Sequence, residues 1–242
     1  MNVKRKTVKR ITVVFLFITY VLLLSGCVQQ GAEKKEEKVI LVTAFEPFGG
    51  EEINPAELIL EKLPEEIGEY RIDKLLLPVE FVASREIALA EYDQLKPDAV
   101  IMLGQKGGAD AIAVETTGVN LMNAVESDGS IDPDNAGYAP DNEPLVEDGA
   151  DKLYSTFAVE EIVQAVNDAG VKCEESDDAG QYVCNALLYS MLEHNNGEVP
   201  TGFIHVPFLK EQAFEEEPYM ELDDMVQAIV AAIKTVKIPA SA

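Results

Sequence analysis

Short apolar runs without polar alternation recur along this chain, and segments with helical spacing lie between them. The run at 39–44 (Val-Ile-Leu-Val-Thr-Ala) is typical of a strand that is buried on both faces, as in parallel sheets. Asn54 and Pro55 then indicate the N-cap and first residue of a helix that continues to about Leu63. Because strands and helices alternate, the sequence predicts an α/β domain with helices covering a largely parallel sheet. Further strands are expected at 72–77, 99–103, 112–119, from 171 onward and at 202–206, and further helices at 81–95, 158–169, 182–193 and 222–233.

Residues 123–149 are dense in Asp, Asn, Gly and Pro, which predicts a long surface loop. Asp128, Ser130, Asp132 and Asp134 alternate within it, as the oxygen ligands of a calcium loop do. The glycine and distal glutamate of an EF-hand are missing at their offsets, so a solvated acidic loop is the favoured interpretation. The histidines and cysteines lack the close spacing of zinc ligands. No metal site is expected.

The first residues have the order of an export signal: a basic start, an apolar run at 11–24 and small residues just before Cys27. The apolar run is shorter than the roughly 20 residues that a transmembrane helix needs. Leu24-Ser25-Gly26-Cys27 resembles the lipobox of bacterial lipoproteins, which implies a diacylglycerol on the Cys27 sulfur and cleavage just before it. An ordinary secretory signal and an uncleaved anchor are the alternatives. The expected organisation is a signal peptide at 1–26, an acylated cysteine with a polar tether at 27–38, and a folded domain at 39–242 outside the cytoplasm.

The charge of the chain bears on its partners. Loss of residues 1–26 removes five basic residues and no acidic one, which takes the formal net charge from −25 to −30. Nucleic acid is therefore not expected as a partner, because phosphate binding needs a basic face. The acidity is expected to form a solvated surface, while the membrane is expected as a partner through the lipid on Cys27. The sequence leaves a homo-oligomer open.

The chain has three cysteines, and acylation of Cys27 would leave Cys173 and Cys184. A disulfide between these two is the default suspicion in an exported protein. Cys184 follows a glycine turn at the start of an apolar helical pattern, where free backbone N–H groups and the helix dipole favour a thiolate and offer an oxyanion site. Cys173 stands beside Glu174 and Glu175, whose charges oppose ionisation. We therefore expect Cys184 to stay unpaired and to alkylate readily near neutral pH.

The chain has only two histidines. His194 lies in a polar stretch where a helix is expected to end, which favours a surface position. His205 follows Gly202-Phe203-Ile204 at the end of a predicted buried strand, where α/β folds usually place working side chains. His205 is thus the candidate base, with a purely structural histidine as the alternative.

Several segments resemble pyroglutamyl-peptidase I in order and spacing. They are Phe-Glu-Pro-Phe-Gly-Gly at 45–50, Ile-Asn-Pro at 53–55, Gly-Gln-Lys-Gly-Gly at 104–108, Glu115 with 119–120, Pro-Asp-Asn at 133–135, 179–180 with Val-Cys-Asn at 183–185, and Gly-Phe-Ile-His-Val-Pro at 202–207. The resemblance runs from about residue 39 to 212. It implies a single three-layer α/β/α domain with a mixed sheet, no cofactor, and a catalytic triad of Glu115, Cys184 and His205. The implied reaction is removal of an N-terminal pyroglutamate (5-oxoproline) from peptides.

A neutral, flat lactam ring suits aromatic faces and a few amide partners. The resemblance therefore implies substrate contacts from Phe45, Phe48, Asn54, Gln105, Tyr182 and Val183. For Asn54, a helix cap is the competing interpretation.

Two positions depart from the family pattern. Thr116 stands where an arginine usually follows the triad glutamate, and an insertion at 125–130 replaces a second expected arginine. Both changes lie in the segment that closes over the substrate in relatives. The rival hypothesis is accordingly a surface lipoprotein that keeps the fold and binds N-blocked peptides without turnover.

Overall fold

The computed structural model describes residues 37–125 and 128–238, which form one compact unit within Glu37–Ala242. The predicted signal peptide, Cys27 and nearly all of the predicted tether lie outside the described residues. Within the described residues, every helix is too short or too polar to cross a bilayer.

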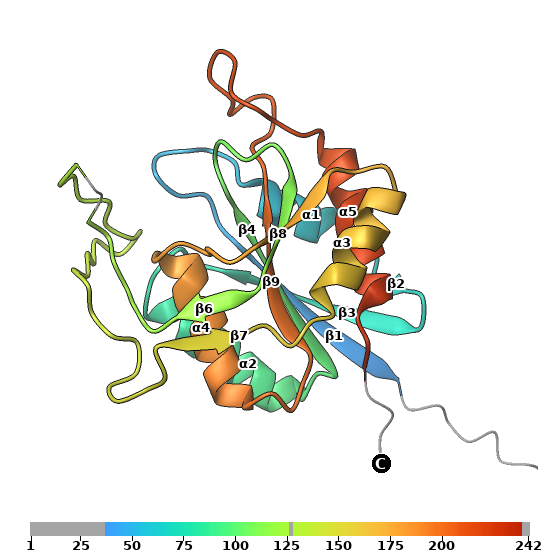
Figure 1. Cartoon of the computed structure of the whole chain (residues 1–242), viewed down its shortest axis with the longest axis horizontal. Helices are drawn as coiled ribbons and strands as arrows, with labels where there is room; N and C mark the ends of the chain where they lie inside the picture. The colour runs from blue at the N-terminus through green and yellow to red at the C-terminus, as the bar shows by residue number, and fades with distance from the viewer. Residues whose placement is uncertain (1–36, 126–127, 239–242) are drawn as a thin grey trace, which may run out of the picture. The chain divides into compact units, whose positions relative to one another are not determined.

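A seven-stranded mixed sheet forms the centre of the domain (Figure 1). Its strand order is β2-β3-β1-β4-β9-β5-β8. The four strands β3, β1, β4 and β9 run parallel, whereas β5 and β8 run antiparallel to β9, and β2 runs antiparallel to β3. The strands are β1 (Lys38–Phe45), β2 (Glu66–Ile67), β3 (Tyr70–Leu77), β4 (Ala99–Gln105), β5 (Ile112–Glu115), β8 (Cys173–Ser176) and β9 (Thr201–Val206). The predicted mixed, largely parallel α/β architecture is confirmed.

Helices cover both faces of this sheet (Figure 1). On one face lie α1 (Pro55–Lys62), α3 (Val159–Asp168) and α5 (Leu222–Thr235), and on the other lie α2 (Ala83–Leu95) and α4 (Val183–Asn195). A two-stranded sheet of β6 (Thr117–Val119) and β7 (Lys152–Tyr154) packs against α4. The result is the expected three-layer arrangement.

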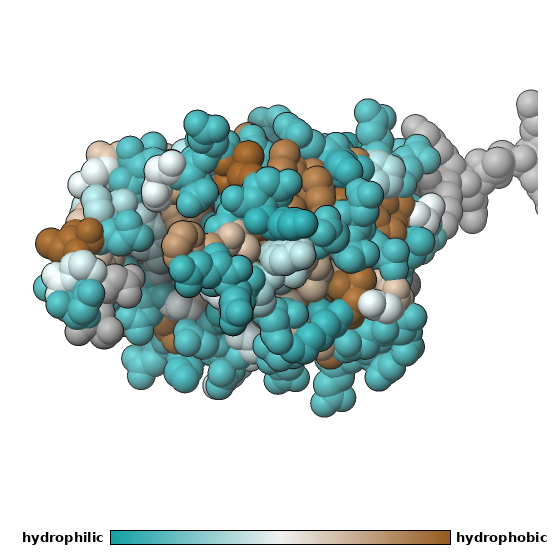
Figure 2. All heavy atoms as spheres, turned by 90° about the horizontal axis from the view of Figure 1, so that it is seen from above, coloured by the Kyte–Doolittle hydropathy of each residue, from teal (hydrophilic) through white to brown (hydrophobic). Residues whose placement is uncertain are grey.

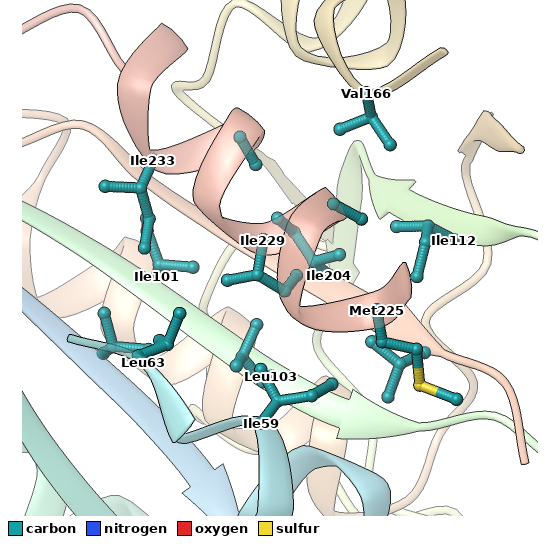
Figure 3. Packing of buried hydrophobic residues seen from close by; sticks show 14 of the residues in the cluster. Ile59, Leu63, Ile101, Leu103, Ile112, Val166, Ile204, Met225, Ile229 and Ile233 are labelled. Carbon is teal, nitrogen blue, oxygen red and sulfur yellow. The ribbon is translucent and has the colours of Figure 1, made fainter. Parts of the chain in front are cut away.

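Each face of the sheet has its own apolar core, because strand side chains alternate between the faces. The α5-side core includes Ile101 and Ile204 of the sheet and Met225, Ile229 and Ile233 of α5. Figure 3 shows these α5 side chains pointing onto the strands. The α4-side core contains the residues of opposite parity, including Leu41, Phe45, Met102, Leu187 and Phe203. Polar residues dominate the face of the surface seen in Figure 2, as the acidic composition predicts.

The predicted strand at 112–119 is two strands in different sheets. β5 ends at Glu115, and the chain then leaves the central sheet at Thr116 to form β6. Gly118 of β6 lies so close to α4 that an added Cβ would be 3.1 Å from the Tyr189 Cα. Thr116 alone separates the two strands, so the sequence pattern shows no break. Sequence reasoning also missed β2 and β7, which are too short to show a strand period.

The described part of the predicted loop at 123–149 has no named strand, and isolated bridges join Val125 to Ile131 and Glu143 to Met122. Asp134 organises it, because its buried carboxylate accepts hydrogen bonds from the backbone N–H groups of Phe81, Ala136 and Tyr138. The next residue, Asn135, donates to the Pro47 carbonyl at 3.1 Å. The loop is thereby attached to the segment between β1 and α1.

We expect Ile229→Ala to lower the free energy of unfolding by about 2–5 kcal/mol, because it empties a fully buried site between α5 and the sheet. Chemical denaturation measures the change. Lys234→Ala, at an exposed position of the same helix, serves as the control and should change stability by less than about 0.5 kcal/mol. Equal effects of the two substitutions would contradict the assigned packing of α5.

Candidate active site

A buried hydrogen bond joins two of the predicted catalytic residues. Glu115 ends β5 and has no exposed surface, and His205 lies in β9 with 4% exposed. The His205 Nδ1 and the Glu115 Oε1 are 2.8 Å apart. A carboxylate only accepts, so Nδ1 carries the proton and Nε2 is the nitrogen left for a nucleophile. Glu115 pairs with Phe203, which is two residues before His205 in β9. Glu115 and His205 are therefore diagonal neighbours on one face of the sheet.

Cys184 lies over that same face, in the first turn of α4. No side chain caps the start of this helix, whose N-cap residue is Tyr182. A Cβ added to Gly104 would come within 2.9 Å of the Cys184 Sγ, and Gly104 pairs in register with His205 across the parallel strands β4 and β9. Residues in register on parallel strands face the same side. The structure therefore places the thiol, the imidazole and the carboxylate on one face.

The local environment raises the pKa of the Cys184 thiol and lowers the pKa of the Glu115 carboxyl. Burial raises the pKa of the Cys184 thiol to about 12, and the Glu115 charge adds to this, while the Cys184 backbone N–H and Lys106 act against it. The expected effect of the helix start is thus present but outweighed by lost hydration. Burial also opposes ionisation of Glu115, but the hydrogen bond and charge of His205, followed by Ser176 and Lys106, bring its pKa below the ordinary value. Glu115 is accordingly a carboxylate, and the thiol keeps its proton until a base accepts it.

Cys173 and Cys184 are both free thiols and lie on opposite faces of the sheet. Cys173 belongs to the α5-side core, whereas Cys184 packs against the α4-side core. Burial raises the pKa of Cys173 to about 12. The expectation that Cys184 is unpaired agrees with this separation.

Four of the six predicted substrate-binding residues gather with Cys184 in the α4-side core. Phe45 and Val183 are buried members of it, and Phe48 and Tyr182 pack against it while partly exposed. The ring centroids of Phe48 and Tyr182 are 6.5 Å apart. These residues offer apolar and aromatic faces next to the thiol.

Asn54 uses both ends of its amide within the protein. Its Oδ1 accepts from the Ala56 N–H at 2.9 Å as the N-cap of α1, and its Nδ2 donates to the Glu46 carbonyl at 3.0 Å. The residue is only 1% exposed. These contacts favour the capping interpretation, in which Asn54 shapes the segment that holds Phe45 and Phe48.

Gln105 points toward the other face of the sheet, because it shares the parity of Leu103 in the α5-side core. Its Oε1 accepts a hydrogen bond from Gln212 Nε2 at 2.8 Å. Gln212 also accepts from the Leu209 N–H and donates to the Ile53 carbonyl, so its amide orientation is fixed by backbone groups. This network favours a structural role for the Gln105 side chain. Sequence reasoning missed Gln212, since an isolated glutamine in a loop gives no signal.

Comparison with known proteins agrees with this geometry. Residues 38–238 match the model of the family described as pyroglutamyl peptidase. The pyrrolidone-carboxylate peptidase of Thermococcus onnurineus is 41% identical over 200 residues, covering 81% of this chain and 97% of the relative. That of Lactobacillus acidophilus is 41% identical over 199 residues, covering 81% and 96%.

The chain belongs to the pyroglutamyl peptidase family. Solved structures of family members share its fold. Pyroglutamyl peptidase I from Bacillus amyloliquefaciens superposes with a TM-score of 0.76 at 30% identity, covering 82% of this chain and 95% of that one. A variant of the pyrrolidone carboxyl peptidase of Pyrococcus furiosus gives 0.76 at 32% identity, covering 82% and 97%.

The uncharged Thr116 follows the predicted triad glutamate and binds the neighbouring edge of the sheet. Its N–H and its hydroxyl both donate to the Ser176 carbonyl, at 2.7 and 3.1 Å. A positive charge reaches Glu115 from another segment: Lys106 Nζ is 3.6 Å from Glu115 Oε1. Sequence reasoning assigned no role to Lys106, although it lies inside the Gly-Gln-Lys-Gly-Gly motif that is part of the resemblance.

We expect Gly104→Ala to reduce the reactivity of Cys184, because the added methyl would lie 2.9 Å from Sγ and 2.7 Å from Phe203 Cζ. The measurement is the rate of Cys184 alkylation by iodoacetamide, followed by peptide mass mapping. Gly202→Ala is the matched control, since its Cβ would crowd Phe157 in the α5-side core instead. It should cost stability but leave the Cys184 rate near that of the unsubstituted chain. Equal loss of reactivity in both variants would contradict the placement of the thiol over Gly104.

Proposed function

We propose that this chain is a cysteine exopeptidase that removes N-terminal pyroglutamate from peptides through a thioester intermediate. The observation that carries this proposal is the buried Glu115–His205 hydrogen bond on the face over which Cys184 lies. The names of the relatives support the substrate, since they are pyrrolidone-carboxylate and pyroglutamyl peptidases.

In the first half of the reaction, His205 Nε2 accepts the proton of Cys184 while the sulfur attacks the carbonyl carbon of the pyroglutamyl residue. Because burial keeps the free thiol protonated, the thiolate forms together with the imidazolium. Glu115 stabilises that imidazolium through Nδ1. The uncapped N–H groups at the start of α4 are in place to hold the oxyanion.

The second half releases the products. The imidazolium of His205 donates its proton to the leaving amine as the C–N bond breaks, which leaves a pyroglutamyl thioester on Cys184. His205 then accepts a proton from water, and the resulting hydroxide attacks the thioester carbonyl. Free pyroglutamate departs and the sulfur recovers its proton.

Recognition of the lactam is assigned to the group formed by Phe45, Phe48, Tyr182 and Val183. These side chains offer a largely apolar surface beside the sulfur. A pyroglutamyl ring is uncharged, whereas a free N-terminal amine would lose its hydration against this surface without a counter-charge. This contrast accounts for a preference for blocked over free N-termini.

We expect Cys184→Ala to lower kcat/KM for a pyroglutamyl-aminocoumarin substrate by about a thousandfold or more, because it removes the nucleophile. Cys173→Ala, which removes the thiol on the other face of the sheet, should retain activity. Fluorescence release under reducing conditions measures both. If the unsubstituted chain is as inert as Cys184→Ala while it still binds a pyroglutamyl peptide, the chain is a binding protein and the hydrolase proposal fails.

We also propose that residues 1–26 are a lipoprotein signal peptide and that Cys27 carries a diacylglycerol, which anchors the domain to a membrane outside the cytoplasm. The support is the basic start, the apolar run and the small residues before Cys27. The polar residues that follow would keep the domain clear of the lipid surface.

Cys27→Ser should move the chain from the membrane fraction to the soluble fraction of a bacterial host, because it removes the acylated sulfur. Cys173→Ala should stay with the membrane. Mass spectrometry of the N-terminal peptide should show a lipid on Cys27 and no residues before it. Recovery of an unlipidated peptide that retains residues 1–26 would refute the anchor.

A further inference from the structure

A lysine outside the predicted triad contacts the triad carboxylate. Lys106 Nζ is 3.6 Å from Glu115 Oε1, the same oxygen that accepts from His205. The Glu115 side chain has no exposed surface, whereas that of Lys106 is 39% exposed. Among the described residues, Glu115 Oε2 has no hydrogen-bond partner within 3.5 Å, although the Ser176 side chain also favours the ionised form of Glu115. A cation beside a buried carboxylate stabilises its charge, here in addition to the hydrogen bond from His205.

The same ammonium also holds the segment that precedes the nucleophile. Lys106 Nζ donates to the Asp178 carbonyl at 3.0 Å. The Asp178 carboxylate accepts from the Gly180 N–H at 3.0 Å, within the turn that leads into α4 and Cys184. The Lys106 backbone is fixed in turn, since its N–H donates to the Val206 carbonyl at 2.9 Å. One side chain thus bridges the carboxylate and the loop that positions the thiol.

Two basic side chains, from β9 and from the segment after β4, contact Glu115. Among the described residues, Lys106 is the cationic side chain within ion-pair distance of it, and His205 Nδ1 donates to the same oxygen. Lys106 favours the ionised forms of both Glu115 and Cys184. The other titratable groups on this face of the sheet are Cys184 of α4, Tyr182 at its N-cap and the exposed Glu174 of β8, which pairs with Ala113, while Asp178 of the preceding loop contacts Lys106 through its backbone carbonyl.

We propose that Lys106 is a positioning residue of the reaction, whose ammonium lies beside the Glu115 carboxylate and ties it to the loop that delivers Cys184. The proposal rests on the proposed function, because it assigns Lys106 to the same triad. When the Cys184 proton moves to His205, a thiolate forms near Glu115, and the positive charge of Lys106 offsets the repulsion between the two anions. Loss of that charge therefore makes the thiolate harder to form.

Three substitutions of Lys106 in the full chain distinguish the effect of its positive charge from the effect of its hydrogen bond. Lys106→Met removes both the charge and the donor, Lys106→Gln keeps a donor without the charge, and Lys106→Arg keeps both. Lys172→Met is the matched control, because Lys172 pairs with Asp110 at 2.6 Å on the surface and contacts none of the triad. Thermal unfolding of each variant verifies that it is folded.

The measurement is the rate of Cys184 alkylation by iodoacetamide from mildly acidic to alkaline pH, with peptide mass mapping to exclude Cys27 and Cys173. We expect the profiles of Lys106→Met and Lys106→Gln to move to higher pH, with a rate near neutral pH that is roughly two- to fivefold lower. Lys106→Arg and Lys172→Met should keep the original profile. Alkylation needs no substrate, so this result does not depend on turnover.

Two outcomes would overturn the proposal: an unchanged profile in folded Lys106→Met, or an equal shift in Lys106→Arg. A parallel assay with the pyroglutamyl-aminocoumarin substrate separates this proposal from the proposed function. An unchanged alkylation profile in an active enzyme rejects only the role of Lys106. A shifted profile in a chain without hydrolytic activity supports the role of Lys106 and rejects the hydrolase.

Discussion

The hydrogen bond between Glu115 and His205 is the interaction on which the rest of the site depends. It lies in a part of the sheet that water does not reach, and there an ionised carboxylate is costly unless its partners are fixed. Those partners come from β9 and from the segment after β4, while the thiol comes from α4. The helices on both faces and the order of the strands are therefore preconditions of the chemistry.

Much of the fold could be predicted from the sequence, because the long elements bury one face or both. The strand at 39–44 and the helix opened by Asn54 and Pro55 are visible as patterns, and the structure has them as β1 and α1. The change of sheet at Thr116 was not visible. It is fixed by pairing with β7 and by packing of Gly118 on α4, which are contacts between segments far apart in the chain.

The site was predictable in a different way. Cys184 and His205 can be singled out by residue type and position, but Glu115 is one of 44 acidic residues and only the resemblance selected it. The contacts in the structure then show that residues of the same motifs have different roles. Asn54 and Gln105 lie in matching motifs, yet their amides hold the protein's own loops, and Lys106 lies among the glycines, yet its ammonium reaches the carboxylate.

The reversed direction of β5 explains why the carboxylate is so well shielded. In an all-parallel sheet, a side chain at the carboxyl end of a strand sits at the edge where ligands enter. Because β5 runs against β9, its last residue lies opposite Phe203, further inside the sheet than His205. In the predicted triad, the carboxylate of Glu115 therefore lies deeper in the sheet than the imidazole of His205. A molecule that approaches from the carboxyl ends of the parallel strands therefore reaches the level of the imidazole before that of the carboxylate.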